Sequence, residues 1–310
     1  MRIFVVFNRK AGSAGTADAL RQRLTARGDV TVYEPDSPEE TRRQTARAKD
    51  EGFDLIVAAG GDGTVHAVVN GLAPDFGGAR LAVLPLGTGN DLRRSLAIPD
   101  DPLAALDLLE SGRERLIDVI RVETPTRSLY AVNTASGGFS GQVQEALTEE
   151  MKAAWGPLAY LRGAAAVLPD LTDYHTTLEF DDGPPERVEA LNVIVANGRF
   201  AAHGWRVASR ADLEDGLLDV VVVRYGPLFD LTEVAAQLLG GDYLESSQVT
   251  LRRARRVRIQ SRPGMWFSID GERVGEEPIT FTVVPHALRV IVGPDYGEGG
   301  PSPRVCSESR

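Results

Sequence analysis

Two carboxylates lie inside glycine-rich turns in the first third of the chain. Asp62 belongs to the turn 60–64 (GGDGT), and Asp91 ends the turn 87–91 (GTGND). Glycine lets main-chain amides approach a ligand closely, and a helix N-terminus presents free N–H groups to an anion such as phosphate. A carboxylate beside phosphates is repelled unless a cation lies between them. The two aspartates therefore predict Mg²⁺, which binds few carboxylates together with substrate phosphates.

A third turn of this kind, at residues 8–12, follows the first apolar run of the chain. Loops that follow parallel strands gather at one edge of a sheet, where ligands of open α/β folds bind. We therefore expect the three turns to form one nucleotide site, although each alone could be an ordinary tight turn. The spacing matches neither a P-loop nor a GxGxxG dinucleotide turn. The predicted nucleotide-binding residues are Asn8, Lys10, Ala11, Gly12, Gly60, Gly61, Asp62, Gly63, Thr64, Gly87, Thr88, Gly89 and Asn90.

Two acidic motifs lie late in the chain. Asp270 and Glu272 flank Gly271 directly after the strand-like segment 266–269. Asp-Gly is a common hairpin turn, so the sequence alone favours a hairpin there. The segment 212–219 carries several carboxylates, and its simplest interpretation is an acidic turn before the strand predicted over 217–223.

The elements that must position these residues change character near residue 117. Before it, apolar runs at 3–7, 31–33, 55–59 and 81–84 alternate with helix-like segments, which predicts a parallel sheet with helices on both faces. After it, strand candidates follow closely, with one helical block over about 142–168 that is expected to face the core or, alternatively, to line an acyl-chain pocket. These strands are predicted over 117–122, 129–135, 176–180, 188–196, 217–223, 256–260, 266–270, 279–284 and 288–292.

The predicted fold class is therefore α/β plus β. We expect a doubly wound, mostly parallel α/β domain over residues 1–122, an antiparallel β-sandwich domain over 123–285, and a loose tail over 294–310.

Composition removes several classes of protein. The 310 residues are 43% hydrophobic and 25% charged, as in an ordinary globular protein. The 34 basic and 44 acidic residues give a net charge of −10, which argues against nucleic acid as a partner. Cys306 is the one cysteine, so no intrachain disulfide forms, which fits a reducing cytoplasm. We expect no signal peptide and no membrane-spanning segment.

Taken in order, these motifs resemble the diacylglycerol kinase catalytic family, which includes soluble bacterial lipid kinases and, more distantly, sphingosine and ceramide kinases. The resemblance extends over about residues 1–293. It rests on the turns 60–64 and 87–91 with Arg94, the segments 197–200 and 212–219 with Gly204, and Asp270-Gly271-Glu272. It implies a nucleotide-binding domain, a β-sandwich domain and an active site in the cleft between them. It also implies that the last strand, about 286–293, returns to the first domain.

The resemblance implies an ATP- and Mg²⁺-dependent kinase that transfers the γ-phosphoryl group to a lipid hydroxyl, with diacylglycerol as the first choice of acceptor. The family role of the late turn makes Asp270 the expected general base, with Glu272 second, while Asp62 and Asp91 complete the predicted catalytic set. In bacterial members, positions matching Asp212, Asp215 and the carbonyl of Leu217 hold a structural Mg²⁺.

Two other functions stay open. One is a NAD kinase-like phosphotransferase with a soluble acceptor, and the other is a nucleotide-binding sensor without catalysis. The acceptor itself could also be another glycerolipid, a sphingoid base or a polyprenol, and a homodimer is among the possible assemblies. His66 and His203 are expected on a surface or within a helix rather than as metal ligands.

A lipid acceptor also predicts peripheral membrane association. The best attachment surface is the basic run Arg252, Arg253, Arg255, Arg256 and Arg258, for which a solvated sheet edge is the alternative interpretation.

Overall fold

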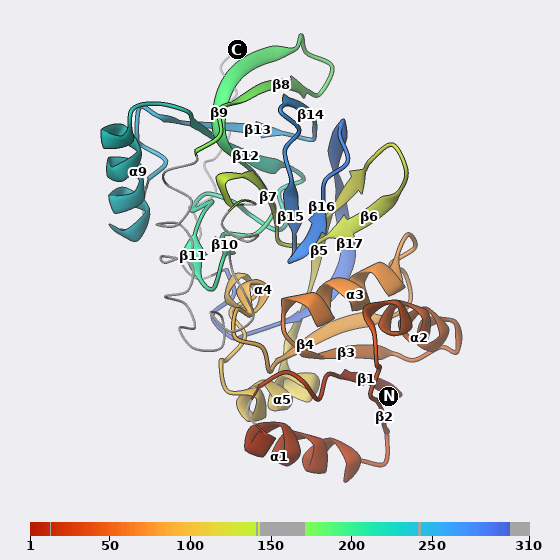
Figure 1. Cartoon of the computed structure of the whole chain (residues 1–310). Coiled ribbons are helices and arrows are strands. Elements are labelled where there is room, and N and C mark those ends of the chain that lie inside the picture. The colour runs from red at the N-terminus through yellow and green to blue at the C-terminus, as the bar shows by residue number, and fades with distance from the viewer. Residues whose placement is uncertain (13, 141, 143–170, 241–242, 298–310) are drawn as a thin grey trace, which may run out of the picture.

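A computed structural model describes residues 1–12, 14–140, 142, 171–240 and 243–297 of the chain (Figure 1). In its first part, strands and helices alternate. These elements are β1 (Ile3–Phe7), α1 (Ala14–Thr25), β2 (Val30–Tyr33), α2 (Pro38–Asp50), β3 (Leu55–Gly60), α3 (Asp62–Leu72), β4 (Arg80–Pro85), α4 (Asp91–Ser95) and α5 (Pro102–Ser111).

The four strands of this part form a parallel sheet in the order β4-β3-β1-β2. Every residue of β1 and β3 is buried, which explains why these strands are continuous apolar runs rather than alternating ones. The start of α2 is set by Ser37, whose side chain accepts a hydrogen bond from the N–H of Glu40, with Pro38 in the first turn. The predicted doubly wound α/β fold of this part is confirmed.

The second part is built mainly of antiparallel strands. Its elements are β5 (Arg113–Glu123), β6 (Ser128–Ala131), β7 (Thr134–Gly138), β8 (Tyr174–Phe180), β9 (Glu186–Ala196), β10 (Phe200–Ala201), β11 (Trp205–Arg206), β12 (Leu218–Arg224), α9 (Leu228–Gly240), β13 (Val249–Ala254), β14 (Arg256–Arg262), β15 (Phe267–Ile269), β16 (Glu272–Val274) and β17 (Ile279–Val292). The strand pairs formed within this part are antiparallel, as predicted.

The central strand β9 is buried on both faces. Val193 and Val195 pack into one apolar core, whereas Ile194 and Ala196 pack into a second core that also contains Val234 of α9. This alternation follows from the two-residue period of a strand.

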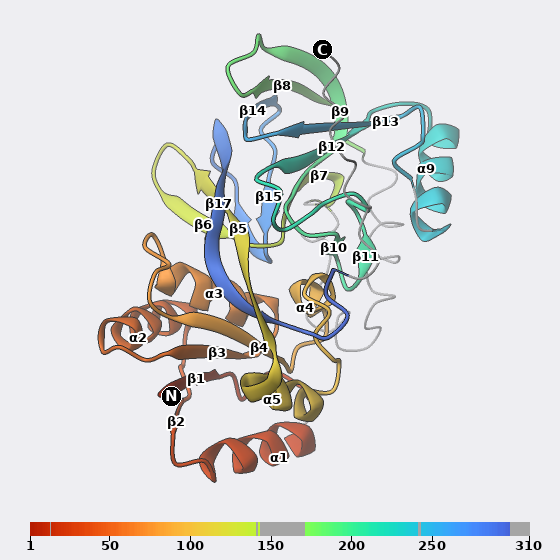
Figure 2. The ribbon, with the colours of Figure 1, turned by 180° about the vertical axis from the view of Figure 1, so that it is seen from behind.

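Strands β5 and β17 connect the two parts. They pair along most of their length, and Figure 2 shows them running together from the antiparallel strands down to the parallel sheet. At the far end of β17, Val290 pairs with Leu81 of β4 in parallel. The register of β17 against β5 shifts between Val284 and Leu288. Both parts therefore share one continuous sheet.

Several predicted boundaries were wrong. The single strand expected over 129–135 is two strands, because Val132 and Asn133 leave the ladder between β6 and β7. The two strands expected over 279–284 and 288–292 are one long strand, β17. Helix α9 and the short hairpin β10–β11 were not predicted. Residues 143–168 of the predicted helical block and most of the predicted tail lie outside the described residues.

The three glycine-rich turns meet at the carboxyl edge of the parallel sheet. Asn8 Nδ2 donates a hydrogen bond to Thr64 Oγ1 at 3.1 Å, which joins the first turn to the second. The second and third turns touch through their main chains: a Cβ atom at Gly87 would lie only 2.4 Å from Cα of Gly61. Only glycine allows this approach, so the spacing of these turns is fixed by their sequence.

Replacing Gly87 with alanine should therefore lower the free energy of unfolding by about 1–3 kcal/mol, because the new methyl group meets main-chain atoms that cannot move aside cheaply. Gly28→Ala is the matched control, since a Cβ there meets nothing within 4 Å. Urea unfolding of both variants checks this, and equal stability of the two would contradict the tight contact.

Candidate active site

A cavity of about 400 Å³ lies between the two parts of the chain. Three aspartates contributed by different elements line it: Asp62 from α3, Asp91 from α4 and Asp270 from the turn between β15 and β16. The rest of its wall is largely apolar, and much of it comes from β9, β12, α9, the β10–β11 hairpin and the segment 132–140. Its apolar lining includes Leu191, Ile194, Val207, Val223, Val234, Leu238 and Tyr243.

Asp62 opens helix α3 directly after the Gly60-Gly61 turn. One oxygen of its carboxylate accepts a hydrogen bond from the N–H of Asp91 at 2.8 Å. Burial raises the pKa of Asp62 to about 6, and the charges of Asp91 and Asp270 add to the rise. Asp62 is therefore a buried carboxylate whose negative charge is poorly compensated by the protein.

Asp91 is tied to the other part of the chain. Its two carboxylate oxygens accept hydrogen bonds from the N–H groups of His203 (3.1 Å) and Gly204 (2.6 Å), in the turn between β10 and β11. Arg94 lies 3.6 Å from the same carboxylate. Burial raises the pKa of Asp91, although the two hydrogen bonds act in the opposite direction. Asp91 thus joins the parallel domain to the β10–β11 hairpin.

Asp270 lies in a two-residue hairpin turn. Ile269 pairs with Glu272, and both turn residues, Asp270 and Gly271, have positive φ values of 44° and 92°. This is the geometry expected of an Asp-Gly hairpin. The hairpin interpretation and the active-site interpretation of this motif are therefore compatible, because the turn itself faces the cavity.

Three main-chain N–H groups hold the Asp270 carboxylate. Oδ1 accepts from Asn133 at 3.2 Å and Thr134 at 3.0 Å, and Oδ2 accepts from Val132 at 2.8 Å. A carboxylate offers about four acceptor positions, so one position on Oδ2 stays available to a ligand. The break between β6 and β7 supplies these donors.

Glu272 points away from the cavity into a cluster of cations. It contacts Nε2 of His66 at 3.1 Å, Arg42 at 2.5 Å and Arg127 at 2.8 Å. The hydrogen bond with His66, helped by the two arginines, lowers the pKa of Glu272 to about 2. Because its charge is already paired with protein cations, Glu272 is poorly suited to be a general base.

The predicted nucleotide-binding residues lie together around the start of α3. Asn90 adopts a left-handed conformation, and its side-chain amide donates to the carbonyl of Gly87 at 2.6 Å. The N–H of Lys10 donates to Oδ1 of Asn8, and Ala11 packs against the core of the parallel domain. Helix α3 has Gly61 at its N-cap and no side-chain cap there, which leaves its first N–H groups open to an anion.

The residues of the predicted metal site, Asp212, Asp215 and Leu217, do not line the cavity that holds the three aspartates. Asp212 and Asp215 each accept a hydrogen bond from the N–H two residues on, those of Glu214 and Leu217. The second oxygen of Asp215 pairs with Arg253. The oxygen-only donor set suits Mg²⁺, but a cation bound to Asp215 would have to compete with that guanidinium. Metal binding at this turn stays a prediction.

Carboxylates pair with much of the predicted basic run. Arg252 contacts Glu186 at 3.1 Å, Arg253 contacts Asp219 at 2.8 Å, and Arg258 contacts Glu179 at 3.0 Å. The positive field of this run is therefore weaker than its sequence suggests. No helix in the described part of the chain is long and apolar enough to cross a membrane.

Several residues of the site could not be found by motif. Val132, Asn133 and Thr134 act through main-chain N–H groups, which any residue type supplies. His66 was expected on a surface or within a helix. It does lie in α3, but it is only 3% exposed and contacts Glu272. The sequence signal at His66 is weak because a single histidine on an apolar helix face usually belongs to the core.

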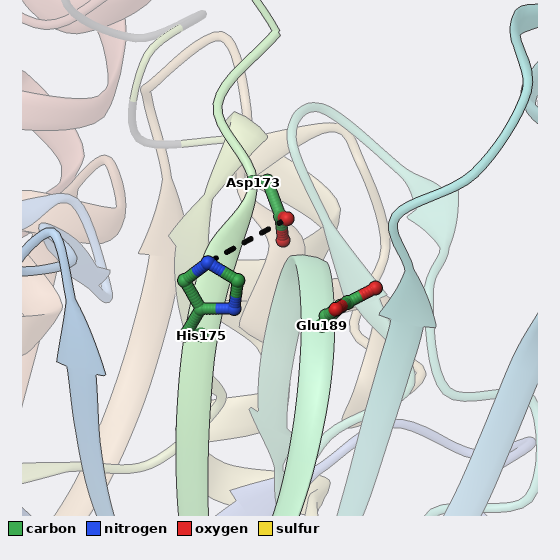
Figure 3. Close-up of side chains that lie close together, drawn as sticks. All are labelled: Asp173, His175 and Glu189. Atoms are coloured by element: carbon green, nitrogen blue, oxygen red, sulfur yellow. Dashed lines mark ion pairs between the residues drawn. The ribbon is translucent and has the colours of Figure 1, made fainter.

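A separate cluster of Asp173, His175 and Glu189 lies on β8, β9 and the segment before β8 (Figure 3). His175 and Glu189 are directly opposite in the antiparallel register, and the ring of His175 lies 3.9 Å from Asp173. His175 and Glu189 are exposed to solvent. Water can therefore satisfy these polar atoms, and the arrangement requires no ion.

Comparisons with known proteins agree with this architecture. Residues 2–122 match the family model of the diacylglycerol kinase catalytic domain, and residues 133–292 match that of the YegS C-terminal NAD kinase beta sandwich-like domain. A diacylglycerol kinase of Staphylococcus aureus is 29% identical over 264 residues, which cover 85% of this chain and 82% of the relative. One from Staphylococcus epidermidis is 28% identical and covers 90% and 86%.

Solved structures show the same fold. A crystal structure described as a diacylglycerol kinase from Bacillus anthracis has a TM-score of 0.78 at 22% identity, covering 94% of this chain and 97% of that one. A further Bacillus anthracis structure has a TM-score of 0.81 at 21% identity, covering 95% and 96%. The expected resemblance is confirmed: the chain belongs to the diacylglycerol kinase catalytic family with a YegS-type C-terminal domain, and it is a phosphotransferase of the lipid kinase type.

Proposed function

We propose that the protein is an ATP- and Mg²⁺-dependent kinase that phosphorylates the free hydroxyl of diacylglycerol to give phosphatidic acid. The observation that carries this proposal is the composition of the cavity wall. Carboxylates suited to phosphoryl transfer and apolar side chains suited to an acyl chain line the same space. A soluble acceptor such as a dinucleotide would leave this apolar wall without a ligand to cover it, which disfavours the NAD kinase-like alternative.

The ATP phosphates would lie at the glycine-rich turns, where the open N-terminus of α3 favours an anion. Asp62, with Asp91 beside it, would hold the Mg²⁺. The raised pKa of Asp62 supports this, because a divalent cation would compensate charges that the protein itself leaves close together and buried. When bound, the ion would neutralise phosphate charge.

The acceptor oxygen attacks the γ-phosphorus, and the bond from that phosphorus to the bridging oxygen of the departing ADP breaks. The hydroxyl proton passes to Oδ2 of Asp270, which keeps a free acceptor position. Asp270 is a better candidate for this role than Glu272, because the latter lies outside the cavity and is bound to Arg42 and His66.

A lipid acceptor has to be reached at a membrane surface, so we extend the proposal to peripheral membrane association. The basic run 252–258, at the end of β13 and the start of β14, is the candidate contact, although Arg252 and Arg258 also pair with carboxylates. Attraction to anionic lipid through this basic run should weaken as salt is added.

The direct test is transfer of labelled γ-phosphate from ATP to diacylglycerol in mixed micelles, with and without Mg²⁺. Labelled phosphatidic acid as the product supports the proposal. Parallel reactions with a sphingoid base, a polyprenol and NAD distinguish the other acceptors. Label found only in one of those products, or only in inorganic phosphate, would contradict diacylglycerol as the acceptor.

The first variant to examine is Asp270→Asn, with Glu272→Gln as its control. Asparagine tolerates positive φ, so the turn can persist while the basic oxygen is lost. We expect kcat to fall by about 10²- to 10⁴-fold with nearly unchanged KM for ATP. Glu272→Gln should have the smaller effect on kcat. The reverse order would move the base to Glu272.

The second variant is Asp62→Asn. In the folded protein the pKa of Asp62 is raised to about 6, so its protonated form stabilises the fold. That contribution is complete below the unfolded pKa near 3.8 and is lost as the pH rises through 6. Asparagine removes the cost of burying the charged carboxylate above this pH. The variant should be inactive, yet more stable than the parent by about 1–3 kcal/mol at pH 7.5, with no gain at pH 4.

Urea unfolding at both pH values measures that difference. Added Mg²⁺ should raise the unfolding free energy of the parent at pH 7.5 but not that of Asp62→Asn. A variant that is active, or that responds to Mg²⁺ like the parent, would remove Asp62 from the proposed metal site.

The third variant fills the apolar end of the cavity. Ile194→Trp should lower kcat/KM for long-chain diacylglycerol by about tenfold or more, because the indole occupies space that an acyl chain needs. Activity toward a short-chain diacylglycerol should be retained, which also shows that the variant is folded. An equal loss for both chain lengths would argue against an acyl chain in this cavity.

A further inference from the structure

His66 is the one histidine among the described residues that is packed between two acidic side chains of the site. Its side chain is only 3% exposed. Nε2 lies 3.1 Å from Oε2 of Glu272, within hydrogen-bond distance. Nδ1 lies 3.9 Å from Oδ2 of Asp270, which is too far for a hydrogen bond but within ion-pair distance.

Both ring nitrogens therefore face carboxylates. A neutral ring would turn one bare nitrogen lone pair toward an anion, whereas a protonated ring presents an N–H group to each side. Burial disfavours the charged ring, but the interactions with Asp270 and Glu272 outweigh it and raise the pKa of His66. Arg42 and Arg127 also face Glu272, so three cations surround that carboxylate.

His66 also lies on the helix that carries Asp62. The two residues are four positions apart in α3, so they lie on the same face of the helix. Asp270 and Glu272 belong to the β15–β16 turn, which is far away in sequence. The contact of His66 with this turn thus links the helix at the proposed phosphate site to the residue that takes the acceptor proton.

We propose that His66 is a positioning residue that sets the placement of Asp270 against the phosphate-binding end of α3 by anchoring the β15–β16 turn through Glu272. This inference rests on the proposed function for the role of Asp270. The Oδ2 atom beside His66 is the one with a free acceptor position. A shift of the turn by about 1 Å would misplace this oxygen, and such shifts can lower rates by about 10²-fold.

Two substitutions of similar size, glutamine and asparagine, test which contact of His66 matters. The amide nitrogen of glutamine can occupy the place of Nε2 and donate to Glu272, whereas asparagine is too short to reach it. We expect His66→Gln to keep kcat within about fivefold of the parent, and His66→Asn and His66→Ala to lower it by about 10- to 100-fold. The KM for ATP should stay within about twofold in all three, because no glycine-rich turn is touched.

Arg127→Gln is the matched control. This substitution also removes a cation that pairs with Glu272. Arg127, however, approaches Glu272 from the exposed side and forms no ion pair with Asp270. We expect it to lower kcat less than His66→Ala does. Equal losses in these two variants, unchanged kcat in His66→Ala, or no recovery with glutamine would each overturn the proposal.

A measurement without substrate keeps this test independent of the acceptor. Thermal unfolding midpoints of the parent, His66→Ala, Glu272→Gln and the double variant form a cycle, and we expect clearly non-additive shifts. Additive shifts would overturn the anchoring contact. A parent protein that fails to phosphorylate diacylglycerol but shows the non-additivity would refute the proposed acceptor and leave the anchoring contact standing.

Discussion

Hydrogen bonds from main-chain N–H groups to buried carboxylates hold this site together. In each case the donor and the carboxylate belong to different segments of the chain. Asp62 accepts from the start of α4, Asp91 accepts from the β10–β11 turn, and Asp270 accepts from the break between β6 and β7. A buried charge without partners would cost several kcal/mol, so each segment is constrained to stay where its donors are needed. Of these bonds, those of Asp91 with His203 and Gly204 cross between the two domains, so they constrain how the domains lie at the cavity.

Much of the fold can be predicted because local patterns and global packing agree. The buried parallel strands are continuous apolar runs, and the turns after them carry the glycines that the close contact of Gly61 and Gly87 requires. Helix α9 was missed although apolar residues recur at helical spacing in 228–240. This part of the chain was predicted from the close spacing of its strand candidates, and that criterion does not detect a single helix among many strands. The continuity of β17 was hidden by Pro285 and by the irregular register around it.

The chemistry of the site was less accessible to sequence. Residue type alone predicts Asp62, Asp91 and Asp270 as site residues, because carboxylates within glycine-rich turns are typical of a ligand site. The sequence does not predict their hydrogen-bond donors, since any residue type supplies a main-chain N–H group and the donors to Asp270 lie about 136 positions away. The different roles of Asp270 and Glu272 also depend on tertiary structure. Although one residue separates these two carboxylates, Asp270 faces the cavity, whereas Glu272 faces the cations of α2 and α3.

The tight turn at Asp270 explains how one short motif can serve both domains. Successive residues of a hairpin end point in different directions, and the positive φ values of Asp270 and Gly271 turn the chain within two residues. Asp270 is thereby fixed to β6 and β7, while Glu272 reaches across to α2 and α3. A longer loop would separate these two anchors and allow the carboxylates to move independently. The compact turn makes the placement of Asp270 depend on the contact of Glu272 with the nucleotide-binding domain.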